Sequence, residues 1–207
     1  MRSIVFVSFF TLIACGPGPE ISPPHDVVCP TLDQAIVGTW TREGGAMEIR
    51  IDGAIVRDAV EGAFRWTTPG RATIDMRGSH EEHTIGLMTI NTLLDVDANG
   101  RAIVWTRISP SPPAPEGCVD LRGSLIGRWT DGATEESFAA SGLYTRGDRS
   151  GVWQLIDASV LQVRIEPGPV IRYRVALASP SVLVSAVEDV DAGEPERGRS
   201  SVETRLP

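Results

Sequence analysis

The length, composition and charge of the chain already exclude several classes of protein. Its 207 residues suffice for one large domain or two small ones, and 42% hydrophobic and 22% charged residues are ordinary for a globular protein. The formal net charge of −8 argues against a nucleic-acid-binding protein. All 19 basic residues are arginine, so chemistry that needs a lysine, such as Schiff-base formation, is excluded.

Residues 1–14 form a candidate signal peptide. Arg2 precedes an apolar run over residues 4–14, which is too short to cross a bilayer because a spanning helix needs about 20 residues. The run ends in the sequence LIAC, which resembles the lipobox of bacterial lipoproteins. The resemblance implies cleavage before Cys15 and lipidation of that cysteine. Gly16 in place of aspartate implies, by the same resemblance, the outer membrane.

Residues 15–28 are then expected to be the lipidated cysteine and a proline-rich tether. Four prolines and no apolar periodicity favour a semi-extended polyproline conformation. Several acyl chains on Cys15 would anchor the protein firmly, since each buried CH₂ contributes about 0.8 kcal/mol. We therefore expect a protein of the cell envelope whose membrane contact is the lipid, with no nucleic-acid partner.

The rest of the chain is predicted to be an internal duplication. A shift of 89 residues superimposes Cys29 on Cys118 and Trp40 on Trp129, with eight identities and no gap over residues 29–77. The segment 109–117 separates the copies, and its four prolines cannot belong to a central strand or a helix interior. The sequence thus predicts two units, 29–108 and 118–207, joined by a linker at 109–117.

Within each unit the apolar residues recur with a period of two, which indicates half-buried strands. Turn signals such as Asn-Gly and Asp-Gly separate about eight short strand candidates in the first unit and seven or eight in the second. Apart from a helical turn at residues 31–35, no amphipathic helix is indicated, which excludes an α/β fold. The predicted class is all-β, with antiparallel meanders closing into small barrels. The clearest alternating segments are 48–52, 64–66, 72–76, 161–165 and 171–175.

Two short motifs in each unit resemble those of lipocalins. Gly38-Thr39-Trp40 and Gly127-Arg128-Trp129 open the units as Gly-x-Trp opens the first lipocalin strand, and each unit ends on Thr-Arg-aliphatic. The resemblance implies two tandem lipocalin-like barrels, with Trp40 and Trp129 closing their floors. The alternative is that each unit supplies half of one larger barrel.

Cys29 and Cys118 are expected to form a disulfide between the units. Each lies eleven residues before its tryptophan, and both ends of a closed meander with an even strand number emerge on the same side. The compartment outside the cytoplasm is oxidising, so a bond between them would persist. The alternative is a pair of buried free cysteines.

Two polar segments have the composition of ion sites but are better explained as turns. Asp95, Asp97 and Asn99 match the start of a calcium loop, yet the twelfth position is Thr106 and no helices flank the segment. His80 and His83 lack a third ligand and are expected in a solvated hairpin turn. We predict no metal, with calcium at the Asp95 segment as the alternative.

No catalytic constellation is recognisable, so we expect a non-enzymatic protein without a cofactor. The tryptophans at positions 40, 66, 129 and 153 could line a cavity for a small apolar ligand in one or both barrels. The alternative is that the barrels are filled by side chains, since eight-stranded barrels leave little interior space. In that case the outer surface would serve as a structural module that binds an envelope protein or polymer.

Overall fold

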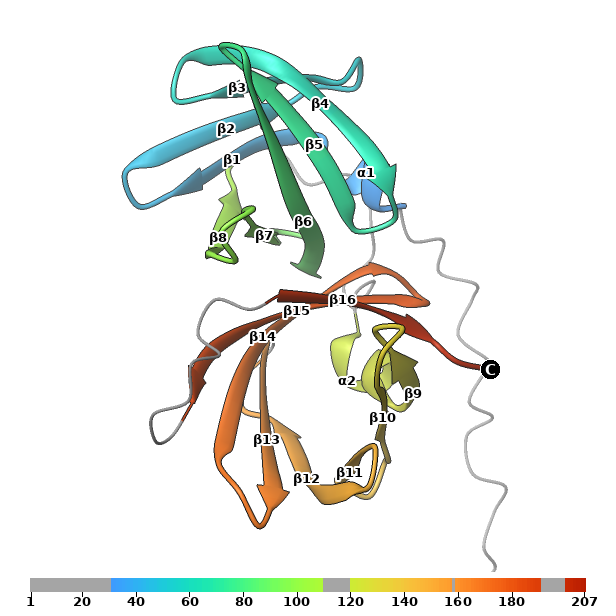
Figure 1. Ribbon diagram of the computed structural model, residues 1–207. Helices are drawn as coiled ribbons and strands as arrows, with labels where there is room; N and C mark the ends of the chain where they lie inside the picture. Colours follow the sequence, from blue (N-terminus) through green and yellow to red (C-terminus); the bar gives the residue numbers. More distant parts are fainter. Residues whose placement is uncertain (1–30, 110–119, 158, 191–199) are drawn as a thin grey trace, which may run out of the picture.

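The computed structural model describes residues 31–109, 120–157, 159–190 and 200–207. The three cysteines and the predicted signal peptide and tether lie outside these ranges, so the lipidation and disulfide predictions concern residues that are not described. Within them the fold is all-β, which confirms the predicted class (Figure 1). The predicted helical turn is present as α1 (Leu32–Ala35), and a second turn of helix, α2 (Leu121–Leu125), occurs where none was predicted.

The first eight strands form a closed antiparallel barrel. Each strand pairs with the next along the chain, and the last pairs back with the first through Trp40–Arg107 and Thr41–Thr106. Because this ring closes within the first unit, the larger shared barrel is not what the chain forms. The strands are β1 (Gly38–Arg42), β2 (Gly45–Ile49), β3 (Ala54–Arg57), β4 (Val60–Thr68), β5 (Arg71–Met76), β6 (Ser79–Thr89), β7 (Thr92–Val96) and β8 (Ala102–Arg107).

The strands of the second unit pair in the same order. Each pairs antiparallel with its successor, and the final strand pairs with β9 through Thr204–Thr130 and Arg205–Trp129. The strands are β9 (Gly127–Thr130), β10 (Glu135–Phe138), β11 (Leu143–Arg146), β12 (Arg149–Leu155), β13 (Val160–Glu166), β14 (Val170–Ser179), β15 (Val182–Val190) and β16 (Ser200–Arg205).

The opening of each unit is built in the same way. Trp40 is fully buried and its Nε1 donates to Ile36 O at 2.8 Å, while the Arg107 guanidinium lies 4.1 Å from the centre of its ring. Gly38 has a φ of +142°, and an added Cβ would lie 2.5 Å from Arg107 Nη1, so only glycine fits. The Gly-x-Trp and Thr-Arg motifs therefore meet in space and fasten the helical turn to the barrel.

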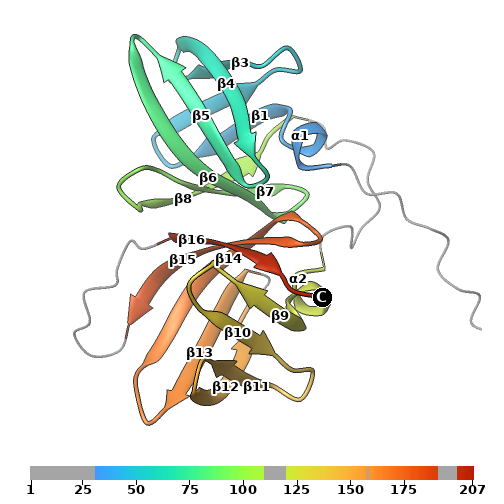
Figure 2. The ribbon, with the colours of Figure 1, turned by 45° about the vertical axis from the view of Figure 1, so that its right-hand side comes forward.

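The two groups of strands are stacked one on the other, with β6 and β14 in contact (Figures 1 and 2). Leu87 pairs with Leu177 across this junction. Gly86 lies so close to the second unit that an added Cβ would be 2.9 Å from Ala176 Cβ. An apolar cluster from both units fills the contact: Met88, Leu94, Val96, Ala176, Ala178, Val184 and Ala186.

Candidate functional site

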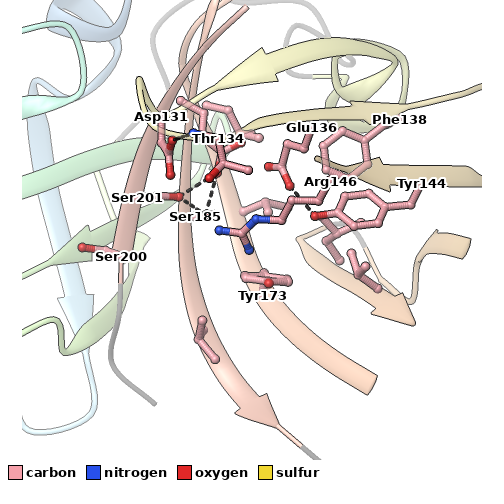
Figure 3. A pocket seen from close by; sticks show the side chains of 16 residues that line it. Asp131, Thr134, Glu136, Phe138, Tyr144, Arg146, Tyr173, Ser185, Ser200 and Ser201 are labelled. Atoms are coloured by element: carbon pink, nitrogen blue, oxygen red, sulfur yellow. Dashed lines mark hydrogen bonds between the residues drawn. The ribbon is translucent and has the colours of Figure 1, made fainter. Parts of the chain in front are cut away.

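A cavity of about 210 Å³ opens inside the ring of strands β9–β16 (Figure 3). Alternate residues of a strand point to the same face, so Tyr173 and Val175 of β14 and Leu183, Ser185 and Val187 of β15 line it. Six lining side chains are apolar: Phe138, Leu161, Val163, Val175, Leu183 and Val187. The polar lining includes Glu136, Arg146, Tyr173, Ser185 and Glu203. The cavity therefore has a lining of mixed polarity.

Glu203 is the most deeply buried carboxyl group of this cavity, with only 6% of its surface exposed. Its Oε1 accepts hydrogen bonds from Ser201 Oγ at 2.6 Å and from Ser185 Oγ at 3.3 Å. Its Oε2 has no hydrogen-bond partner among the described residues. Burial, and next the neighbouring carboxyl of Glu136, hold the pKa of Glu203 well above its usual value of 4.5.

Glu136 is held by the Tyr144 hydroxyl, which donates to its Oε2. Burial, followed by the charge of Glu136, raises the pKa of Tyr144, so this hydroxyl stays a donor. Figure 3 shows the Arg146 side chain projecting into the middle of the cavity, towards Tyr173. Burial lowers the pKa of Arg146, but the nearby Tyr144, Tyr173 and carboxyl groups outweigh it and the net shift is upwards.

The mouth of the cavity carries a further carboxylate. Asp131 Oδ1 accepts from the backbone N–H of Thr134 at 2.7 Å and of Ala133 at 2.8 Å. These two hydrogen bonds keep the pKa of Asp131 below its usual value. Asp131 is thus a stable negative charge in the turn between β9 and β10, and its Thr134 neighbour also lines the cavity.

The pairing registers identify the equivalent positions in the first barrel. Both β6–β7 and β14–β15 have a bulge after the pairs Leu87–Leu93 and Leu177–Leu183. Counting from these pairs, His83 corresponds to Tyr173, Asp95 to Ser185 and Trp105 to Glu203.

In the first barrel these positions hold large side chains that bind one another. His83 Nδ1 lies 2.6 Å from Asp95 Oδ1, and Trp105 Nε1 donates to Asp95 Oδ2 at 3.2 Å. His83 Nε2 lies 3.2 Å from Glu81 Oε2, which also accepts from Arg57 Nη2 at 2.9 Å. Burial lowers the pKa of His83, but the hydrogen bond and charge of Asp95 outweigh it and raise the pKa overall.

The predicted ligand-binding tryptophans lie in the cores rather than around the cavity. Trp40 and Trp129 are fully buried, and Trp153 is 8% exposed and packs edge-on against Phe138 at 5.6 Å. Trp66 is half-buried and lines a separate hollow of about 510 Å³ between the units, with Leu87 and Leu177. None of the four is among the described residues that line the cavity of about 210 Å³.

The histidine segment differs from the predicted turn. The turn lies at Arg77–Gly78, and strand β6 begins at Ser79, so both histidines are on a strand. His80 is exposed and bonds Asp75, whereas His83 faces the core, because alternation carries it inward to the buried Asp95.

The Asp95 segment forms the predicted turn between β7 and β8. Asp97 Oδ1 accepts from the backbone N–H of Asn99 and of Arg101, both at 2.9 Å. Asp95 itself is 1% exposed and bound to His83 and Trp105. Within the described part of the chain, no three His, Cys, Asp or Glu side chains are placed to hold a metal ion.

Sequence reasoning missed Glu136, Tyr144 and Glu203. A position-by-position reading of the duplication contains the signal, because Met47 and Ile55 of the first copy are replaced by Glu136 and Tyr144 in the second. An inward position that changes from apolar to polar between two copies indicates a function that only one copy has. Arg146, which also lines the cavity, matches Arg57 at the same shift of 89 residues.

Comparisons of the chain with protein-family models, with curated proteins and with solved structures found no match. The helices of the described ranges are too short and too polar to cross a membrane. What the geometry defines is an all-β protein with a closed eight-stranded antiparallel barrel and, in its second half, a cavity of mixed polarity.

Proposed function

We propose that the chain is a lipid-anchored envelope protein with two tandem lipocalin-like barrels, and that the second barrel binds a small molecule. The two-barrel organisation is supported by the sequence duplication and by the repeated order of strand pairing. The arrangement of Trp129 beneath Arg205, 4.6 Å from ring centre to guanidinium, repeats that of Trp40 beneath Arg107. The protein is not proposed to be an enzyme.

The single observation that carries binding is the lining of the cavity. A space of about 210 Å³ is lined by six apolar side chains together with ionisable groups. It holds about seven times the roughly 30 Å³ that a water molecule occupies in the liquid, so a ligand of few atoms would fill it. The ligand is therefore a small amphiphile with a polar head, which revises the purely apolar ligand expected from the sequence.

The first barrel is proposed to be the filled, structural partner. At the positions where the second barrel has Tyr173, Ser185 and Glu203, it has His83, Asp95 and Trp105, which are bonded to one another. The alternative of a structural module whose outer surface binds an envelope protein or polymer thus applies to the first barrel. Lipidation of Cys15 with the tether at residues 16–28 would hold the pair of barrels at the outer membrane.

Native mass spectrometry of the full-length protein, gently extracted from its own membrane without reductant, tests this function. We expect a non-covalent mass on top of the acylated chain. Thr134→Trp places an indole at the mouth and is expected to abolish the adduct, because Thr134 lines the cavity. The matched control is Ala133→Trp, which changes the exposed residue next to Thr134 and should retain the adduct.

The outcome that contradicts the proposal is a bare acylated chain, or an adduct that survives Thr134→Trp unchanged. The same spectrum tests the bond between Cys29 and Cys118, since that disulfide lowers the mass by two hydrogens. It also tests cleavage and lipidation at Cys15, because the observed mass would otherwise include residues 1–14.

A further inference from the structure

We propose that the cavity of the second barrel takes a small organic cation, a primary ammonium on an apolar body of about six carbons, whose ammonium donates to Glu203 Oε2 and Glu136. This inference rests on the proposed function and names the class of ligand. Three independent features of the cavity support it: its balance of charges, an acceptor without a donor, and the chemistry of its wall.

Among the described residues that line the cavity, carboxyl groups outnumber cations by three to one. Glu136 on β10, Glu203 on β16 and Asp131 at the mouth face the guanidinium of Arg146 on β11. Two carboxyl groups held together cannot both ionise readily without a compensating positive charge. A proton on Glu203 reduces the excess from two carboxylates to one, and a bound cation would take over this task.

The carboxyl of Glu203 offers the cavity an acceptor without a donor once its proton has left, because Oε1 already accepts two hydrogen bonds and Oε2 is the oxygen that carries the proton. Glu203 is only 6% exposed. Its Oε2 has no hydrogen-bond partner among the described residues, whereas its Oε1 accepts two hydrogen bonds. Buried polar atoms are nearly always hydrogen-bonded, so an exception in a cavity indicates a missing partner. An ammonium has three donors and no acceptor, which suits an acceptor-rich site.

The rest of the lining suits the stem of such a ligand. The rings of Phe138, Tyr144 and Tyr173 line the cavity with five aliphatic side chains. Aromatic faces attract cations, and the aliphatic wall would bury the carbon chain. An anion would find one cation, Arg146, among the carboxyl groups of Glu136 and Asp131, and a neutral alcohol would leave the excess of negative charge in place.

Binding of a cation is expected to release the Glu203 proton. The groups that face Glu203 are Glu136 on β10, Tyr144 and Arg146 on β11 and Tyr173 on β14; its neighbours on β15 and β16, Ser185 and Ser201, do not titrate. The cation and the proton compete for Glu203. Raising the pH removes the proton, so the affinity of the cavity for the cation should increase with pH. A neutral probe should show no such increase.

Isothermal titration calorimetry of the full-length protein with hexylamine, 1-hexanol and hexanoate tests the class of ligand. Hexylamine stays charged between pH 6 and 8, since alkylammonium groups such as lysine titrate at about 10.4. We expect hexylammonium to bind more tightly than hexanol at pH 8 and the advantage to shrink towards pH 6, by at most about tenfold per pH unit. Hexanoate should bind most weakly.

Glu203→Gln is expected to reduce hexylammonium affinity by about tenfold or more and to change hexanol affinity little, because only the charge is lost. Glu136→Gln should act in the same direction and covers the case in which the first variant does not fold. Glu166→Gln, an exposed carboxyl of the same barrel outside the cavity, is the matched control and should change neither affinity.

The possible failures are distinguishable. If hexanol or hexanoate binds as tightly as hexylammonium, the cation is the wrong ligand class but small-molecule binding stands. If none of the three binds while the extracted protein carries an adduct, the proposed class of ligand is wrong but small-molecule binding stands. If none binds and there is no adduct, the proposed function falls with it.

Discussion

Glu203 occupies the position at which the first barrel has Trp105. The tryptophan fills its barrel and donates to Asp95, whereas the glutamate leaves a cavity and an unpaired oxygen. Burying a carboxyl without full hydrogen bonding costs free energy of folding. We interpret this cost as the sign of a binding site, since a barrel selected for stability alone would carry an apolar residue there.

The raised pKa of Glu203 predicts a pH dependence of folding. Its carboxyl keeps a proton in the folded protein at pH values at which the unfolded chain, with a pKa near 4.5, releases it. The folded state then binds more protons, so the free energy of unfolding should fall as the pH rises above 4.5 towards the raised pKa. Urea denaturation at pH 5, 6, 7 and 8 measures this change in the free energy of unfolding.

Glu203→Gln should remove this component and flatten the pH profile, while Glu166→Gln should leave it as in the wild type. The comparison is needed because His83, whose pKa is also raised, contributes stability below 6.5 that is lost as the pH rises through its folded value. Parallel profiles for wild type and Glu203→Gln would show that Glu203 does not hold a proton in the folded state.

The His83–Asp95 pair of the first barrel predicts a non-additive response to mutation. Both side chains are at most 2% exposed, so His83→Leu would leave the Asp95 carboxylate buried without its main partner. Removing one partner of such a pair costs about 3–5 kcal/mol, whereas replacing both by apolar residues is often nearly neutral. The double variant with Asp95→Leu should therefore regain most of the loss in urea denaturation. Equal destabilisation of single and double variants would contradict this account.

At the scale of elements, the closing strand of each unit fastens its helical turn through an arginine. Arg107 donates to the backbone oxygens of Ala35, Val37 and Ile90. Arg205 donates to the oxygens of Ser124 and Ile126, and its buried Nε has no hydrogen-bond partner in the described part of the chain. The two copies thus differ by one hydrogen bond from a charged donor.

Arg107→Met is therefore expected to destabilise the protein more than Arg205→Met. One charge-assisted hydrogen bond contributes about 1.5–3 kcal/mol, and this is the difference that we expect between the two free energies of unfolding. In both variants the methionine side chain still covers the tryptophan ring. The contribution of this packing should therefore be the same in both and cancel when the two free energies of unfolding are compared. Equal losses would mean that the bond to Ile90 O contributes nothing.

At the scale of the molecule, the units share an apolar contact that should make them unfold together. Leu94 and Val184 are fully buried there, and both belong to the apolar cluster that residues of the two units form together. We expect one calorimetric transition for the wild type. Leu94→Asp places a charge in this contact and should separate the unfolding of the two units into two transitions.

Val152→Asp is the control for this experiment, because Val152 is half-exposed on the second unit and away from the contact. It should lower the transition temperature little and leave a single transition. A Leu94→Asp protein that still unfolds in one step would show that the units are coupled by something other than this cluster.

Local patterns in the sequence were sufficient to predict the all-β class, most strands, the helical turn at Leu32–Ala35 and the turn after Asp95. These features depend on alternation and on turn residues that act over a few neighbours. The histidine segment was predicted wrongly, because Arg77–Gly78 forms the turn and two polar histidines were taken for solvent-exposed residues.

The site was decided by tertiary structure. Glu136, Arg146 and Glu203 come from three strands, and Glu203 lies 57 residues after Arg146, so no local pattern links them. Whether a barrel is filled or hollow depends on the summed volume of side chains that meet across it. Large bonded residues occupy these positions in the first unit, whereas smaller or ionisable ones leave about 210 Å³ in the second, and only the pairing of distant strands brings those residues together.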